Sequence, residues 1–168
     1  EPFPFRPEDV DFVLQTHAHI DHSGLLPKLT TTGFRGKIFA TEGTKDLLTF
    51  MLPDSGYIQE MEVEHRNRRS QRRGKAEVAP IYTRKDAEAC LSHIVALDYE
   101  DWVQVGPDVR ARFWNAGHIL GSASIEVEID QEGGEPLRLL FSGDIGPDNK
   151  LFHPDPDAPA GFDYVISE

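Results

Sequence analysis

The chain has 168 residues, 39% of them hydrophobic and 27% charged, which is typical of one soluble globular domain with a hydrophobic core. The composition excludes a membrane-spanning helix, an N-terminal signal peptide is not expected, and a single cysteine excludes both an internal disulfide and a thiolate zinc site. The formal net charge of −12 argues weakly against a nucleic-acid partner, and we expect a cytoplasmic location and no membrane partner.

The first third of the chain alternates between strand and helix patterns. Strand, helix, strand and helix are predicted in turn over residues 11–16, 23–31, 36–41 and 41–52. Ser23 is the expected N-cap of the first helix, and Thr41 or Thr44 that of the second. This order of elements predicts an α/β fold.

The middle of the chain is predicted to hold two further helices. Residues 54 to about 74 are mainly polar and are predicted to form a long helix with an exposed basic end. Residues 83–97 predict a better-defined helix, in which Thr83 and Asp86 resemble a capping box. Its apolar stripe consists of Ala87, Leu91, Ile94 and Val95.

The rest of the chain changes to the two-residue period of strands. Residues 109–114 and 123–129 alternate between apolar and polar side chains, which predicts strands with one buried face. The nearly continuous apolar runs at 137–142 and 164–167 predict two more strands, the second of them buried. A turn is expected over 130–136, where two glycines lie between polar residues.

The densest group of metal-capable side chains lies in "THAHIDHSG", directly after the first predicted strand. His17 and His19 are two residues apart at a strand end, so their imidazoles point to one side and can converge on one ion. Asp21 and His22 follow in the turn, and their side chains can reach a position next to that ion. Imidazole suits zinc, iron or copper, and a carboxylate widens the choice. The alternative is a polar loop that happens to contain several histidines.

Two more candidates lie downstream, each in a glycine-flanked loop at a strand end. His118 in "NAGHILGS" lies between two predicted strands, and Asp144 in "FSGDIG" follows a strongly apolar one. A carboxylate at such a position can bridge two metals, because each of its oxygens can contact one ion. An ordinary loop histidine and an aspartate in a tight turn are the alternatives.

A basic segment interrupts the acidic chain. "HRNRRSQRRGK", residues 65–75, contains six Arg and Lys residues and no acid. Such a segment can offer a positive surface to a phosphate backbone, and a solvated helix face is the alternative. The candidate RNA-binding residues are Arg66, Arg68, Arg69, Arg72, Arg73 and Lys75.

The pattern H-x-H-x-D-H, then a histidine in a glycine-flanked loop, then an aspartate after an apolar strand, resembles the metallo-β-lactamase superfamily of dinuclear metal hydrolases. The resemblance implies part of an αβ/βα four-layer sandwich, with mixed sheets and flanking helices. It implies that His17, His19 and His118 hold one metal. Asp21 and His22 would hold the other, and Asp144 would bridge the two.

A narrower resemblance, to the β-CASP branch of RNA-processing nucleases, covers nearly the whole chain. It depends on "DSGYIQ" with the Arg-rich end that follows, "PIYTRKDA", "GHILGSASIEV" and the closing "YVISE", in which Glu168 would be the Glu of E-S-T-Y-G. It implies that residues 1–168 are a partial metallo-β-lactamase domain. The first strands before residue 1, the inserted β-CASP domain after residue 168 and a later histidine ligand would be missing. We therefore expect poor activity from this segment alone.

These resemblances imply a metal-dependent RNA nuclease, endonucleolytic or 5′-exonucleolytic, that attacks phosphodiester bonds with a hydroxide shared by two metals. The implied cofactors are two divalent ions, zinc first, with manganese or iron as alternatives. Asp21 and His22 are the expected catalytic residues, although Asp21 could instead be a ligand only. A homodimer of the full-length protein is expected. The alternatives are a hydrolase of a small ester, thioester, lactam or phosphodiester, and an inactive scaffold, which the intact ligand set disfavours.

Overall fold

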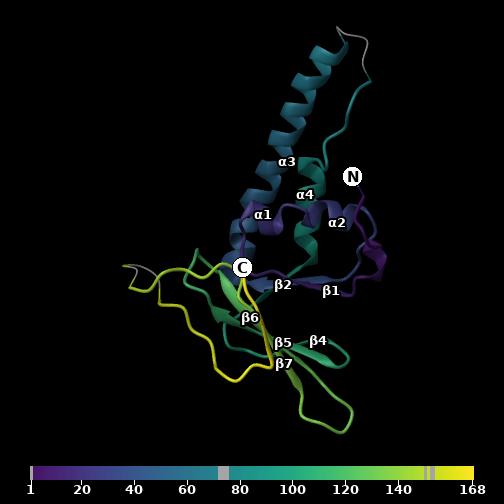
Figure 1. The fold of residues 1–168 in the computed structure, drawn as a ribbon. Coiled ribbons are helices and arrows are strands. Elements are labelled where there is room, and N and C mark those ends of the chain that lie inside the picture. The colour runs from purple at the N-terminus through teal and green to yellow at the C-terminus, as the bar shows by residue number, and fades with distance from the viewer. Residues whose placement is uncertain (1, 72–75, 150, 152–153) are drawn as a thin grey trace.

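The computed structural model describes residues 2–71, 76–149, 151 and 154–168. In this part of the chain, helices cover one face of a small sheet, and a second sheet packs against the other face (Figure 1). This arrangement confirms the predicted α/β class with two sheets, one of them mixed, and flanking helices.

The first sheet consists of three parallel strands in the order β1-β2-β3. They are β1 (Phe12–Leu14), β2 (Lys37–Thr41) and β3 (Ile94–Leu97). In β2, Ile38 and Ala40 belong to the core on the helical side, whereas Phe39 belongs to the core on the other side. The strand is buried on both faces, as expected for a central parallel strand between two layers.

The helices are α1 (Ile20–Ser23), α2 (Leu26–Thr31), α3 (Glu42–Gln71) and α4 (Arg84–Cys90), with short 3₁₀ turns η1 (Pro7–Asp9) and η2 (Leu91–His93). The helical core on the first sheet contains the buried side chains of Leu29, Leu48, Leu52, Ala87 and Cys90. Helix α3 is much the longest and extends well beyond both sheets (Figure 1). No helix in the described ranges is both long and apolar enough to span a bilayer.

The second sheet has five strands in the order β4-β5-β6-β7-β8, antiparallel except for the last pair. They are β4 (Val103–Gly106), β5 (Val109–Asn115), β6 (Ala123–Ile129), β7 (Leu137–Phe141) and β8 (Tyr164–Ile166). As the two-residue period predicted, Ala111, Phe113, Ile125 and Val127 form the inner face of this sheet. They pack against Phe39 of the first sheet, so the two sheets enclose a common core.

The predicted N-cap role of Ser23 is wrong. Ser23 is the last residue of α1, and α2 begins at Leu26 after a break. The buried Ser23 hydroxyl donates instead to the carbonyls of Ala18 and His19, both at 2.9 Å. It thereby satisfies backbone acceptors of the histidine segment, because serine can bond back to preceding carbonyls.

The two helices predicted over 41–52 and 54–74 are one helix through Gln71, and residues 72–75 lie outside the described residues. Pro53 lies inside α3, although a proline removes one helical N–H. Beyond Pro53, the segment that returns toward α4 packs along the helix. Tyr82 donates to Ser55 at 2.9 Å, and the amide of Arg84 donates to Glu60 at 3.2 Å. The predicted cap at Thr41 is confirmed, since its hydroxyl accepts from the Thr44 amide.

The helix predicted over 83–97 ends much earlier than expected. Its start is confirmed, because Thr83 and Asp86 form both bonds of a capping box. After Cys90 and η2 the chain becomes β3, so Ile94 and Val95 are strand residues on opposite faces. Pairing with β2 and the β-branched side chains override the helical spacing here.

The strand predicted over 164–167 exists but is not buried. Strand β8 pairs with the edge of β7, and Tyr164, Val165 and Ile166 are 64%, 59% and 47% exposed. The apolar run correctly predicted that a strand is present, but not that this strand lies exposed at the edge of the sheet. Strand β4 was not predicted from the sequence, because the alternation of Val103 and Val105 alone is too short to indicate a strand.

Candidate metal centre

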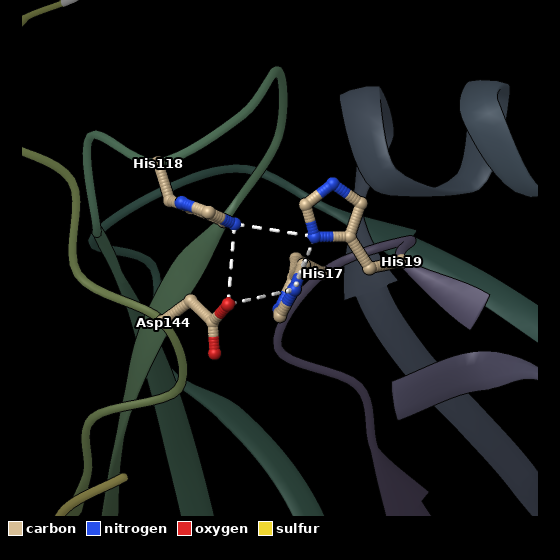
Figure 2. Close-up of side chains that lie close together, drawn as sticks. All are labelled: His17, His19, His118 and Asp144. Atoms are coloured by element: carbon tan, nitrogen blue, oxygen red, sulfur yellow. Dashed lines mark hydrogen bonds and ion pairs between the residues drawn. The ribbon is translucent and has the colours of Figure 1, made fainter. Parts of the chain in front are cut away.

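Three imidazoles and one carboxylate converge on a point between the two sheets (Figure 2). Nδ1 of His19 lies 3.2 Å from Nε2 of His17 and 3.2 Å from Nε2 of His118. Oδ2 of Asp144 lies 3.2 Å from Nε2 of His118 and 3.8 Å from Nε2 of His17. We call these four residues the first ligand group.

The spacing of these four atoms fits a tetrahedral metal site. An ion about 2.0–2.1 Å from four ligands would separate neighbouring ligand atoms by about 3.3 Å. Hydrogen bonds alone do not explain the arrangement, because a single ring nitrogen of His19 faces two other imidazole nitrogens and carries at most one proton. The donor set of three imidazoles and a carboxylate is one that zinc, iron and manganese accept.

The surroundings of His17 favour its neutral form, which can bind a metal ion. Its side chain is 1% exposed, and burial, followed by the nearby charge of His22, lowers its pKa to about 4. The imidazole is therefore neutral at pH 7, and one ring nitrogen has a free electron pair. Its Nδ1 lies 3.2 Å from the Thr16 hydroxyl, an outer contact that can hold the ring with Nε2 directed to the group.

Backbone pairing brings the His17 segment to the site. The segment continues the line of β1: the Gln15 amide donates to the Phe39 carbonyl of β2 at 2.9 Å. One residue later, the Thr16 carbonyl accepts from the Ala123 amide of β6 at 2.8 Å. The chain thus passes from the first sheet to the second immediately before His17, so His17 lies where the sheets meet.

A second ligand group lies on the other side of Asp144. It contains His22, Asp144 and Glu168. Oδ1 of Asp144 lies 3.3 Å from Nε2 of His22, and an oxygen of Glu168 lies 3.7 Å from the same nitrogen. The two oxygens of Asp144 therefore face different groups, as a bridging carboxylate requires.

Asp144 reaches this position because its loop approaches the His17 segment closely. Gly143 has a φ of +52°, and a Cβ there would lie 2.8 Å from the Cβ of Thr16. Only glycine fits both constraints. Next to the second ligand group, a cavity of about 180 Å³ is lined in part by His22, Gly143 and Glu168. This cavity leaves room for water or a substrate group beside the carboxylates.

Asp21 lies at the edge of the site rather than within either group. Its side chain is 78% exposed, and Oδ2 lies 3.7 Å from Nε2 of His22. Glu168, by contrast, was expected only as a motif residue and not as a member of the site. Its proximity depends on the pairing of β8 with β7, which places the ends of both strands side by side.

The described arginines of the basic segment lie far from the ligand groups. Arg66, Arg68 and Arg69 are exposed on the last turns of α3, which begins beside the His118 loop and is about 45 Å long for its 30 residues (Figure 1). Arg68 forms an ion pair with Glu64. The other three candidates, Arg72, Arg73 and Lys75, lie outside the described residues.

The chain is similar in sequence to one protein family and to several known proteins. The model of the metallo-beta-lactamase superfamily matches residues 4–167. A ribonuclease of Thermus thermophilus, TTHA0252, is 35% identical over 167 residues, which are 99% of this chain and 33% of that protein. The transcription termination factor FttA of Methanocaldococcus jannaschii is 37% identical over 142 residues, or 84% of this chain and 20% of that protein.

Among the solved structures that the chain matches is MEM-A1, a subclass B3 metallo-beta-lactamase isolated from a soil metagenome library. It has a TM-score of 0.49 and 19% identity, over 82% of this chain and 43% of that chain. The Rm3 metallo-beta-lactamase has a TM-score of 0.48 and 20% identity, over 89% of this chain and 48% of that chain.

Proposed function

The chain belongs to the metallo-beta-lactamase superfamily, and on this premise we propose that it provides the metal centre of an RNA nuclease. The observation that carries the proposal is the pair of ligand groups that share Asp144. The name of the Thermus relative, a ribonuclease, supports RNA as the substrate class. The chain spans about a third of that relative, so the activity is proposed for the whole protein.

In this proposal, His17, His19, His118 and Asp144 hold one divalent ion. His22 and Asp144 hold a second one, with Asp21 or Glu168 as the further carboxylate. Ions bound there would lower the pKa of a water molecule and offset the negative charge that develops on a phosphoryl oxygen. We propose zinc as the metal, with manganese or iron as alternatives.

Asp21 is the proposed proton acceptor. Its exposed carboxylate lies next to His22 but outside both ligand groups, so it can contact a water molecule at the mouth of the site. His22 then has a positioning role as well as a ligand role, because its ring faces Asp21, Asp144 and Glu168. No nucleophilic side chain is needed, since water is the attacking group.

The exposed arginines of α3 are the proposed RNA contacts. An RNA strand that contacts both the ligand groups and these arginines would run along α3, over a path of about 45 Å. Arginine contacts with phosphate carry no information about the bases, which suits a nuclease that holds the backbone. The proposed attack on RNA is endonucleolytic or 5′-exonucleolytic. It includes a cytoplasmic location and a homodimer of the whole protein.

The experiment is cleavage of a labelled single-stranded RNA by the protein encoded by the complete gene, with zinc or manganese, and with His17→Ala as control. We expect cleavage that a chelator abolishes and that His17→Ala lacks. Intact RNA, together with metal-dependent hydrolysis of a small ester or thioester, would refute the nuclease proposal in favour of a small-substrate hydrolase. We also propose that the segment 1–168 alone is poorly active and holds the second ion weakly. Its RNA cleavage and its metal content after incubation with zinc test both points.

A further inference from the structure

Two threonine hydroxyls from the start of α3 hold one carbonyl of the loop that carries His118. The Thr41 hydroxyl donates to the Gly121 carbonyl at 2.5 Å, and the Thr44 hydroxyl donates to the same oxygen at 2.8 Å. Both threonines are buried, at 2% and 0% exposure. We propose that Thr41 and Thr44 are positioning residues for His118, and this rests on the proposed metal centre.

The contact is close enough to fix the loop against the helix. Gly121 has a φ of +77°, and a Cβ there would lie 2.1 Å from the Thr44 amide nitrogen. Gly43, one residue before Thr44, also packs against Gly121. A Cβ added at Gly43 would lie 3.0 Å from the Cα of Gly121. The loop and the first turn of α3 therefore pack backbone to backbone, and the two hydroxyls satisfy the carbonyl that this packing buries.

Hydrogen bonds of Ser122, the residue after Gly121, connect Gly121 to His118 within the turn of residues 116–122. The Ser122 hydroxyl accepts from the amides of His118 and Ile119, at 3.0 and 3.1 Å. The Ser122 amide donates to the Ile119 carbonyl at 3.0 Å, and its carbonyl accepts from Ala116 at 3.1 Å. These bonds connect Ser122, the neighbour of Gly121, to the backbone of Ala116, His118 and Ile119. We therefore expect a shift of Gly121 to move the imidazole of His118 relative to His19 and Asp144.

The two threonines are not equivalent. Thr41 also caps α3, because its hydroxyl oxygen accepts from the Thr44 amide at 3.2 Å. A change at Thr41 therefore weakens the helix start as well as the loop contact. The Thr44 hydroxyl can be removed while this cap remains, so Thr44 gives the cleaner test of positioning.

The test is the affinity of the full chain for Co²⁺, followed by the absorption of the bound ion, in Thr44→Val, Thr44→Ser and the control Thr49→Val. Valine has the shape of threonine but no hydroxyl, and serine retains the hydroxyl. Thr49 lies on an exposed part of the same helix, and its hydroxyl donates to the Asp46 carbonyl within the helix. Thermal melting establishes that each variant is folded, and Thr44→Ala replaces Thr44→Val if the latter is unfolded.

We expect Thr44→Val to bind Co²⁺ about tenfold more weakly with an altered spectrum, which is the low end of the effect of groups that orient metal ligands directly. Thr44→Ser should restore the affinity, and Thr49→Val should match the wild type. A loss smaller than about threefold, or no recovery with serine, would overturn the proposal. Cobalt binding requires no RNA, so a wild type that binds the ion without cleaving RNA would refute only the proposed function.

Discussion

Oδ1 of Asp144 lies 3.3 Å from Nε2 of His22, although the other oxygen of the same carboxylate belongs to the first ligand group. One side chain thus connects two sets of ligands, each of which combines residues of the 17–22 segment with residues from the last third of the chain. This connection makes the consequences of changing Asp144 different from those of changing any histidine.

Asp144→Asn should lower the metal content of both ligand groups, since the variant loses the negative charge that both share. His22→Ala should affect the second group alone, because His22 belongs only to that one. The measurement is the number of zinc ions per chain after gel filtration, by mass spectrometry of the metal. Equal losses in the two variants would contradict a bridging Asp144.

The pKa of His17 predicts acid sensitivity of the metal-free protein. Burial lowers this pKa from 6.5 to about 4, so the unfolded chain takes up a proton at a higher pH than the folded chain does. The stability is therefore retained above about pH 6.5 and falls as the pH decreases toward 4, by up to about 1.4 kcal/mol per pH unit.

Urea unfolding of the metal-free protein at pH 7 and pH 5 measures this effect. His17→Gln removes the titrating group and should reduce the difference between the two pH values. A wild type that is equally stable at both would show that His17 is not kept neutral by the fold.

Glu126 should be important for stability, although it lies on the outer face of the second sheet. Its carboxylate is fully buried and accepts from Arg112, Arg138 and the Trp114 indole, at 2.7–2.9 Å for the shortest contact with each. Burial tends to raise its pKa, but the bonds from Arg138, Trp114 and Arg112 together hold it below the usual value.

Glu126→Gln leaves the two guanidinium groups without this counter-charge, so we expect a loss of about 3 kcal/mol in the free energy of unfolding. Glu132→Gln, in the exposed turn after β6, is the matched control and should have little effect. Because the folded pKa of Glu126 is lowered, the stability from this residue is lost as the pH falls through the acid range. A Glu126→Gln variant as stable as the control would exclude a net contribution from the cluster.

Replacing Arg66, Arg68 and Arg69 with alanine should weaken RNA binding without changing the metal centre, which lies at the other end of α3. Each lost phosphate contact reduces the slope of log affinity against log salt by about 0.7 for a single strand. Binding of a labelled RNA across a salt series measures the slope, with Arg6→Ala as a control for an exposed arginine outside the basic segment. An unchanged slope would favour the solvated-helix interpretation of this segment.

The predictions from sequence were most accurate where a feature depends on near neighbours in the chain. The Thr83–Asp86 capping box and the Thr41 cap involve residues three apart, and both are present. The inner faces of β5 and β6 follow from the two-residue period, which any half-buried strand shows. Helix ends were predicted less well, because the end of α4 depends on the pairing of β3 with β2.

The sequence by itself determined which side chains could bind metal, because His17, His19, His118 and Asp144 each stand at a strand end with the right chemistry. Only the tertiary structure decided how these residues are divided, with Asp144 shared, Asp21 at the edge and Glu168 beside His22. Only the tertiary structure brought Thr41 and Thr44 to Gly121, about 80 residues away. Local patterns record the chemistry of single elements, whereas distances between elements depend on how the two sheets and α3 pack together.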